Sequence, residues 1–275
     1  MLSNKFKINY SIGSVANGVK TDTFTFFLLF FYSNIIGLNP GLAGSAIFIA
    51  LCIDAITDPL MGTISDRTNS SLGRRLPYMF ISFIPMSLGY IFLFAPRQGW
   101  DMSQTDLFLW MTVFTVLTRL GMTLFDIPHR AFGGEVTKDY QERTILMSWR
   151  EAFGWIAGLS NAFLGYGIFF ASTPEYPQGQ LNPDAWFPFA LTGAIVMIIS
   201  VLYSSYSTKD EIKSLSKWTG NITLTDIFKE LRIAIGNKSF LIFFVGNLFL
   251  SLSWGLANTL TCLLYTSPSP RDSNL

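Results

Sequence analysis

The stretch "LCIDAITDPLMGTISDRTNSSLGRRLPYM", residues 51–79, places acidic side chains inside an apolar run and basic side chains directly after it. Asp54 and Asp58 are spaced i and i+4, so they share one face of a helix, about a turn apart. If the run spans a membrane, each carboxylate costs several kcal/mol unless it faces a cavity, pairs with a cation or binds an ion. Two carboxylates on one face also repel each other unless a cation or a proton lies between them. The stretch therefore predicts a transmembrane helix with a functional polar face.

The composition of the whole chain favours a membrane setting. Of its 275 residues, 50% are hydrophobic and 13% are charged, whereas a soluble domain carries about 25% charged residues. The net charge is +1, and the lysines and arginines form short clusters between apolar runs, which gives no indication of nucleic-acid binding. Phosphate-binding loops and hydrolase motifs are missing from the sequence, so we expect neither an enzyme nor a bound cofactor.

The apolar runs predict an all-α polytopic membrane protein with seven spans, since a spanning helix needs about 20 mostly apolar residues. The expected spans cover approximately residues 11–36, 41–64, 77–96, 106–130, 148–171, 185–206 and 239–265. Lysine and arginine gather in the loops on the N-terminal side of the membrane, and the opposite loops contain only Arg97. Because basic residues accumulate in cytoplasmic loops, we expect a cytoplasmic N-terminus and a multi-pass location in the cell inner (plasma) membrane.

The pattern along the chain also predicts its domain organisation. Residues 1–206 are expected to form a six-helix transmembrane bundle, and 239–265 a seventh span that begins a second bundle. Residues 207–238 are expected to be a cytoplasmic linker with an amphipathic helix, whose apolar face comprises Leu224, Ile227, Phe228, Leu231 and Ile235. The polar residues 266–275, with two Ser-Pro pairs, are interpreted as a non-native or disordered tail.

The acids of the second span suggest a cation site. Thr57 adds a neutral oxygen beside Asp54 and Asp58, and Thr123 of the fourth span can complete an oxygen cage. Hard monovalent cations prefer oxygen ligands, and no other metal is expected. The alternative is that both acids form salt bridges to Lys20 or Arg119.

Candidate solute-binding residues lie in the first, fourth and fifth spans. In "LTRLGMTLFDIPHRAFGG", residues 117–134, Arg119, Thr123 and Asp126 follow one helical stripe. Asp126 can accept hydrogen bonds from a polar solute or pair with Arg150, and the whole stripe can equally be an internal salt-bridge network. In the first span, Lys20 and Asp22 either contact a ligand or, for Lys20, snorkel to the interface.

Charged residues at the cytoplasmic ends of the spans form a candidate gate, in which ion pairs hold one conformation and separate in another. The expected members are Gly62, Asp66, Arg67, Gly73, Arg74, Arg75, Glu142 and Arg143. Gly62 is expected to permit close helix approach, and Gly73 to allow the turn before the arginine pair. The alternative is that the arginines only enforce topology.

Two blocks, "DAITDPLMGTISDRTNSSLGRRLPYM" and "FDIPHRAFGGEVTKDYQERTILMSWR", resemble the glycoside-pentoside-hexuronide:cation symporter family of the major facilitator superfamily. The resemblance covers most of residues 8–265. It implies a twelve-helix fold of two six-helix bundles, of which this chain supplies the N-terminal bundle, the linker and the first helix of the second bundle. It also implies a sugar-contacting acid at Asp126 and a cation site made of Asp54, Thr57, Asp58 and Thr123.

The chain departs from the family pattern at several positions. A family asparagine at the cation site is Thr57 here, which keeps an oxygen but leaves sodium, lithium and proton use open. A Lys-Asp pair of the first helix aligns with Asn17 and Gly18, a sugar-stacking aromatic with Arg130, and an arginine of the fifth helix with Glu151. These departures argue against a galactoside as the solute.

Taken together, these patterns predict a monomeric secondary transporter that moves a sugar or related small polar solute, such as a glycoside, pentoside or uronide, by alternating access. The coupling ion is expected to be Na+, with Li+ and H+ as alternatives. Two other functions stay open, a cation-coupled lipid or lysolipid carrier and a non-transporting membrane sensor or scaffold.

Overall fold

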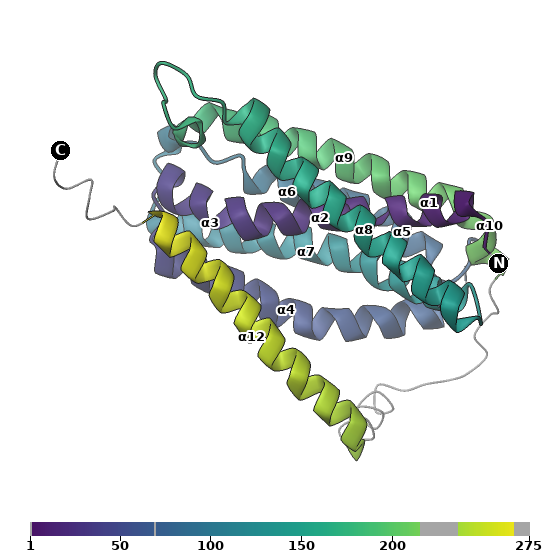
Figure 1. Cartoon of the computed structure of the whole chain (residues 1–275). Helices are drawn as coiled ribbons and strands as arrows, with labels where there is room; N and C mark the ends of the chain where they lie inside the picture. Colours follow the sequence, from purple (N-terminus) through teal and green to yellow (C-terminus); the bar gives the residue numbers. More distant parts are fainter. Residues whose placement is uncertain (1, 69, 215–235, 267–275) are drawn as a thin grey trace. The chain divides into compact units, whose positions relative to one another are not determined.

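The fold is seen in a computed structural model that describes residues 2–68, 70–214 and 236–266 (Figure 1). All regular elements in these ranges are helices. The chain divides into two compact units, Met1–Trp218 and Thr219–Leu275, which we describe separately.

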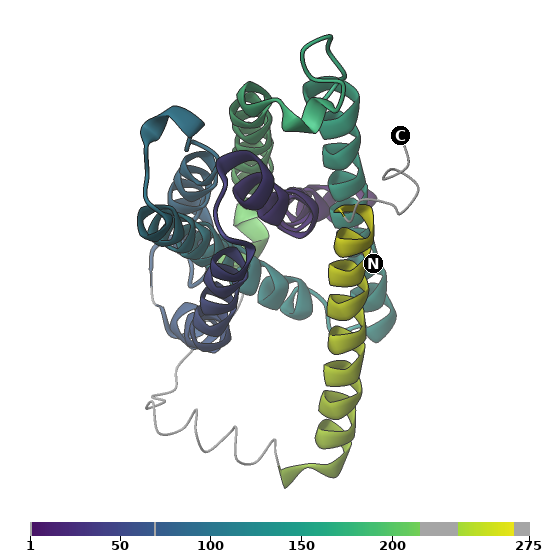
Figure 2. The same ribbon diagram turned by 90° about the vertical axis from the view of Figure 1, so that its left-hand side faces the viewer.

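The first unit is a bundle of long helices, which Figure 2 views nearly along their axes. Its first part comprises α1 (Asn4–Ile12), α2 (Ser14–Asp22), η1 (Thr23–Phe27), α3 (Leu28–Phe30), η2 (Phe31–Ile36), α4 (Pro40–Arg67), α5 (Leu76–Ile81), α6 (Phe83–Leu93) and η3 (Gln98–Trp100). Its second part comprises α7 (Gln104–Glu135), α8 (Tyr140–Leu164), η4 (Gly165–Phe169), η5 (Gly179–Leu181), η6 (Pro183–Ala185), α9 (Trp186–Ser207) and α10 (Lys209–Ser214). The long helix α7 packs against α4 and α6, while α2 packs against α8 and α9.

The membrane spans expected from hydropathy are present as helices. Within the described residues, 6 helices are long and apolar enough to cross a membrane. The expected first span is also helical from Asn4 to Ile36, but short π-helical turns, η1 and η2, interrupt it. Near η1 the Thr25 hydroxyl donates to the Thr21 carbonyl at 2.7 Å, a side-chain bond that competes with the regular backbone ladder.

Close helix packing depends on glycine at specific crossings. A Cβ at Gly18 of α2 would lie 2.1 Å from the carbonyl oxygen of Gly154 in α8. A Cβ at Gly121 of α7 would lie 2.3 Å from the backbone nitrogen of Met86 in α6. In membranes, small residues at such crossings let the backbones approach and gain van der Waals contact. These crossings fix the rotation of α2 and α7, which carry candidate site residues.

The second unit contributes one described helix, α12 (Lys238–Thr266), which matches the expected seventh span. The predicted amphipathic helix with Leu224, Ile227, Phe228, Leu231 and Ile235 lies outside the described residues. Residues 267–275 of the predicted tail also lie outside them.

Candidate cation and solute site

The two acids of α4 face α7 and have different partners. Asp54 Oδ2 accepts a hydrogen bond from Nη1 of Arg119 at 2.5 Å, and both side chains are mostly shielded. The other carboxylate oxygen of Asp54, Oδ1, is buried and has no hydrogen-bond partner among the residues that the structure describes. The sequence offered two bases, Lys20 and Arg119, as partners for the acids, and the structure pairs Arg119 with Asp54.

Asp58 has a neutral partner instead. Its Oδ1 accepts a hydrogen bond from the Thr123 hydroxyl at 2.7 Å, and Thr123 is 6% exposed. Thr57 shares this face of α4, where its hydroxyl donates at 3.5 Å to the carbonyl of Asp54 in the same helix. Within the described residues no three His, Cys, Asp or Glu side chains gather as a metal cluster. Asp54, Asp58 and Thr123 thus bring two carboxylates and one hydroxyl to the contact between α4 and α7.

Asp126 lies further along α7 and belongs to a second charge cluster. Arg150 of α8 forms an ion pair with Asp126 and donates from Nη1 to Glu151 Oε1 at 2.6 Å. Arg130 donates to the other oxygen of Asp126 at 2.6 Å. Arg150 is 1% exposed, so this pair is held inside the bundle. Asp126 was expected to bind either a polar solute or Arg150, and in the structure it pairs with Arg150.

The first span places its charged residues on different sides. Lys20 interacts electrostatically with Arg119 and with the carboxylates of Asp54, Asp58 and Asp126, and makes no ion pair with a described residue. Asp22 is 8% exposed and accepts a hydrogen bond from Asn161 of α8 at 3.0 Å. The structure thus brings Lys20, but not Asp22, to the acids of α4 and α7. Residues two apart on a helix point to different faces, which explains the separation.

A buried aromatic stack supports the end of α7 that carries Asp126. The ring of His129 lies between those of Tyr10 and Phe125, with centroids 4.1 and 4.9 Å away. A hydrogen bond also links Tyr10 to His129: the Tyr10 hydroxyl donates to the His129 backbone carbonyl at 3.1 Å. His129 is fully buried, which fits a structural role for this histidine.

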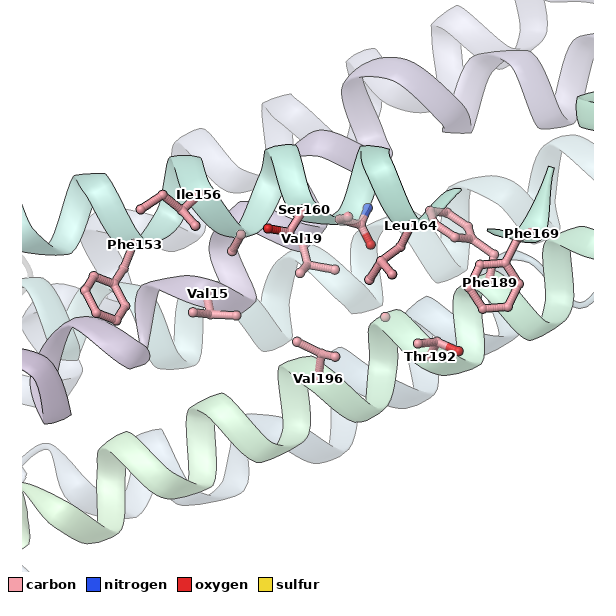
Figure 3. A pocket seen from close by; sticks show the side chains of 13 residues that line it. Val15, Val19, Phe153, Ile156, Ser160, Leu164, Phe169, Phe189, Thr192 and Val196 are labelled. Atoms are coloured by element: carbon pink, nitrogen blue, oxygen red, sulfur yellow. The ribbon is translucent and has the colours of Figure 1, made fainter. Parts of the chain in front are cut away.

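A separate groove opens between α2, α8 and α9, and Figure 3 shows its lining side chains. Its volume is about 330 Å³, and most of its wall is aliphatic or aromatic, including Val15, Val19, Phe153, Leu164 and Phe189. No charged residue lines it. The groove is therefore distinct in chemistry from the polar cluster between α4 and α7.

The expected cytoplasmic gate is an ion-pair cluster at the ends of α4 and α7. Arg75 donates to Asp66 at 2.7 Å and to Glu135 at 2.6 Å, and Arg74 also pairs with Glu135. Gly73 has φ +93°, a left-handed conformation that favours glycine and forms the expected turn. The sequence analysis did not name Glu135 as a gate residue. The feature that could have pointed to it is its position directly after the pair Gly133–Gly134, between two charged segments.

The other predicted gate residues have diverse surroundings. Glu142 is buried and pairs with Lys7 of α1 at 3.3 Å, so it ties two helices of one bundle together. Arg143 is exposed and donates to the Thr137 carbonyl at 3.2 Å. The expected close helix approach at Gly62 is not seen within the described bundle and stays a prediction. A Cβ there would meet only Ile127 of α7, at 3.7 Å, which is an ordinary van der Waals contact.

Comparison with known proteins identifies the family of this chain. Residues 9–267 match the family described as MFS/sugar transport protein. The chain belongs to this family. It is thus a multi-pass membrane protein with the all-α fold of the major facilitator superfamily, as the two sequence blocks predicted.

Curated relatives of this family are named as symporters. The uncharacterized symporter sll1374 of Synechocystis is 33% identical over 198 residues, which cover 71% of this chain and 35% of the relative. The putative glycoside/cation symporter YagG of Escherichia coli is 29% identical over 238 residues, 86% of this chain and 49% of the relative. The sodium-dependent lysophosphatidylcholine symporter 1-A of Danio rerio is 29% identical over 174 residues, 61% of this chain and 31% of the relative. The chain spans between about a third and a half of the length of these relatives.

Proposed function

We propose that this chain belongs to a secondary transporter that couples the movement of a sugar or related small polar solute to a monovalent cation. The observation that carries the proposal is the oxygen cluster between α4 and α7. There Asp54 keeps one buried oxygen that no residue of the described ranges hydrogen-bonds, while Asp58 accepts from Thr123. A buried carboxylate oxygen without a donor is costly, and a bound cation removes that cost. Sodium is the proposed ion, and lithium and protons are the alternatives that the test separates.

Coupling follows from linkage between cation and solute. Asp126 and Arg150 lie on the same two helices, α7 and α8, that border the interior of the bundle, and both offer hydrogen bonds to solute hydroxyls. If solute binding requires the acids of α4 to be neutralised, each ligand raises the affinity for the other by the same factor. The proposed setting is the cell inner membrane with a cytoplasmic N-terminus, supported by the positive charge of the loops on that side.

Cation binding is the step to test first, because the residues proposed for it all lie in the first unit. In detergent, we expect Na+ to raise the thermal midpoint and change the tryptophan fluorescence of the purified chain, in a saturable manner. Asp58→Asn should abolish the response, because it removes a carboxylate from the oxygen cluster. Asp101→Asn is the matched control, since Asp101 is exposed in the loop before α7 and has φ +47°, which asparagine tolerates.

The alternatives give different results in the same experiment. A response to Li+ or to acid without a response to Na+ would reassign the coupling ion. If no cation changes the stability or fluorescence of the chain, the proposal is wrong and the acids are a structural latch between α4 and α7.

A lysolipid is the second candidate cargo. The observation in its favour is the similarity to the lysophosphatidylcholine symporter of Danio rerio, which is named as sodium-dependent. Both cargoes share the proposed cation site, so Asp58→Asn does not separate them. Once the cation response is established, sugars and lysophosphatidylcholine can be compared by their effect on the sodium affinity, because only the true cargo raises it.

A further inference from the structure

The ion pair between Arg119 and Asp54 leaves polar atoms of both partners unsatisfied. Arg119 reaches only Oδ2 of Asp54, and no described residue donates to the buried Oδ1. The Nε of Arg119 is also buried, and no described residue accepts from it. A buried ion pair stabilises a fold only when further hydrogen bonds satisfy the remaining donors and acceptors. This pair is therefore poorly built as a permanent latch.

The charges around the pair are already balanced. Asp54 and Asp58 are matched by Arg119 and by Lys20, which interacts electrostatically with both acids. Further along α7 and on α8, Asp126 and Glu151 are matched by Arg130 and Arg150. An added cation would leave this interior with excess positive charge, which is expensive in a medium of low dielectric constant. A positive charge must therefore leave the site when a cation enters: a lysine can lose its proton, whereas an arginine keeps its charge and has to move.

The geometry points to Arg119 as that group: we propose that its guanidinium is a tethered counter-ion which occupies Asp54 until the coupling cation displaces it. This inference rests on the proposed cation site and adds a residue that sets its affinity. Arg119 is the positive group directly bonded to a carboxylate oxygen of that site, whereas Lys20 makes no ion pair with a described residue. Exchange at Asp54 replaces one positive charge by another, so the charge balance of the interior is preserved.

The surroundings of Arg119 offer a place for the displaced guanidinium. Its Cζ lies 5.4 Å from the ring centroid of Phe24, within the range of a cation–π contact. Phe24 belongs to the π-helical turn η1 of the first span. Movement of the guanidinium from Asp54 toward Phe24 would thus transmit cation binding from α4 to the first span.

The test compares the sodium affinity of the wild-type chain with those of three variants, all purified in detergent and measured in neutral buffer. Arg119→Gln removes the competing charge, and we expect its Kd for Na+ to fall by about tenfold or more, since a unit charge a few ångströms away acts at this scale. Arg119→Lys keeps the charge, so its Kd should stay near that of the wild type. Arg97→Gln is the control for loss of a guanidinium outside the site, because Arg97 is exposed in the loop before α7.

A measurement on the unaltered chain covers the case in which Arg119→Gln does not fold. With ¹⁵N-labelled arginine, the side-chain Nε–H resonance that disappears in Arg119→Lys identifies Arg119. We expect this resonance to shift during a sodium titration and to saturate with the binding curve, because the guanidinium changes its surroundings. A resonance that does not move while sodium binds would overturn the inference.

The outcomes separate this inference from the proposed function. If the wild type binds sodium and Arg119→Gln binds it no more tightly, Arg119 is a structural partner of Asp54 and the cation site stands without it. If neither form binds sodium or lithium, the cation site itself is withdrawn, and the role of Arg119 with it.

Discussion

At the scale of single residues, the two acids of α4 differ in what their partners can do. Asp54 faces a positive group that competes with a cation, whereas Asp58 faces the Thr123 hydroxyl, which can assist one. A hydroxyl offers both a donor and lone pairs. It can donate to the carboxylate when the site holds no ion and turn an oxygen toward an ion when it does. Thr123 is therefore the neutral ligand that we expect to matter most.

Replacement of Thr123 by valine tests this role with almost no change of shape. Loss of the hydrogen bond to a charged acceptor should cost about 1.5–3 kcal/mol of stability, and sodium affinity should fall by about tenfold. Thr123→Ser keeps the hydroxyl and should retain most of the sodium response. Thermal midpoints at several sodium concentrations measure both effects together. Equal sodium affinity in the valine and serine variants would show that the hydroxyl is not a ligand.

The sequence predicted the residues of this site better than their pairings. The i, i+4 spacing fixed Asp54 and Asp58 on one face, and the stripe on the fourth span brought Arg119, Thr123 and Asp126 to the interior. Which base pairs with which acid depends on the rotation and height of neighbouring helices, and no local pattern encodes these. The spacing of Lys20 and Asp22 does predict that these two side chains point in different directions, because residues two apart do not share a helix face.

At the scale of elements, the contact between α2 and α8 sets the rotation of the first span. Gly18 of α2 lies against the backbone at Gly154, and Gly158, one turn further along α8, faces the Gly18 carbonyl. A small-residue pair of this kind lets two helices touch through their backbones. The arrangement holds Lys20 near the charged interior and Asp22 against Asn161.

Gly18→Ala should separate these helices. Its Cβ would be placed 2.1 Å from a backbone oxygen, which has no flexible side chain to yield. We expect a loss of about 1–3 kcal/mol, in the range of overpacked cores, and a lower thermal midpoint. Gly44→Ala is the matched control, because a Cβ at Gly44 of α4 meets nothing within 4 Å. A thermal midpoint that falls equally in both variants would show that the contact between α2 and α8 is not tight.

Element positions were predictable because hydropathy and helix length are linked by the thickness of the membrane. The fourth span, expected over 106–130, extends to Gln104–Glu135, since its polar ends continue the helix beyond the apolar part. The breaks η1 and η2 in the first span were not predicted, because the run stays apolar through both of them and its hydropathy does not distinguish a π-helical from an α-helical turn.

At the scale of the molecule, ion pairs tie together one end of the first unit across long stretches of sequence. Arg75 is fully buried and links Asp66 at the end of α4 to Glu135 at the end of α7. Lys7 and Glu142 connect the first helix to α8 in the same way. Both pairs lie near the loops that the distribution of charge assigns to the cytoplasm. They tie the helices together at that end of the bundle.

Glu135→Gln tests whether this clamp holds the first unit together. The substitution removes the negative charge that pairs with both Arg74 and Arg75. Because the Arg75 side chain is only 1% exposed, its buried positive charge then keeps fewer negative partners. Breaking a fully buried pair costs about 3–5 kcal/mol, but the Glu135 side chain is 40% exposed, so we expect about 1–2 kcal/mol. The thermal midpoint should therefore fall in Glu135→Gln and stay unchanged in Glu175→Gln, whose carboxylate is exposed in the loop after η4.

Sodium affinity should be the same in both variants, because neither residue contacts Asp54 or Asp58. A large change of sodium affinity in Glu135→Gln alone would instead show that the clamp and the cation site are coupled.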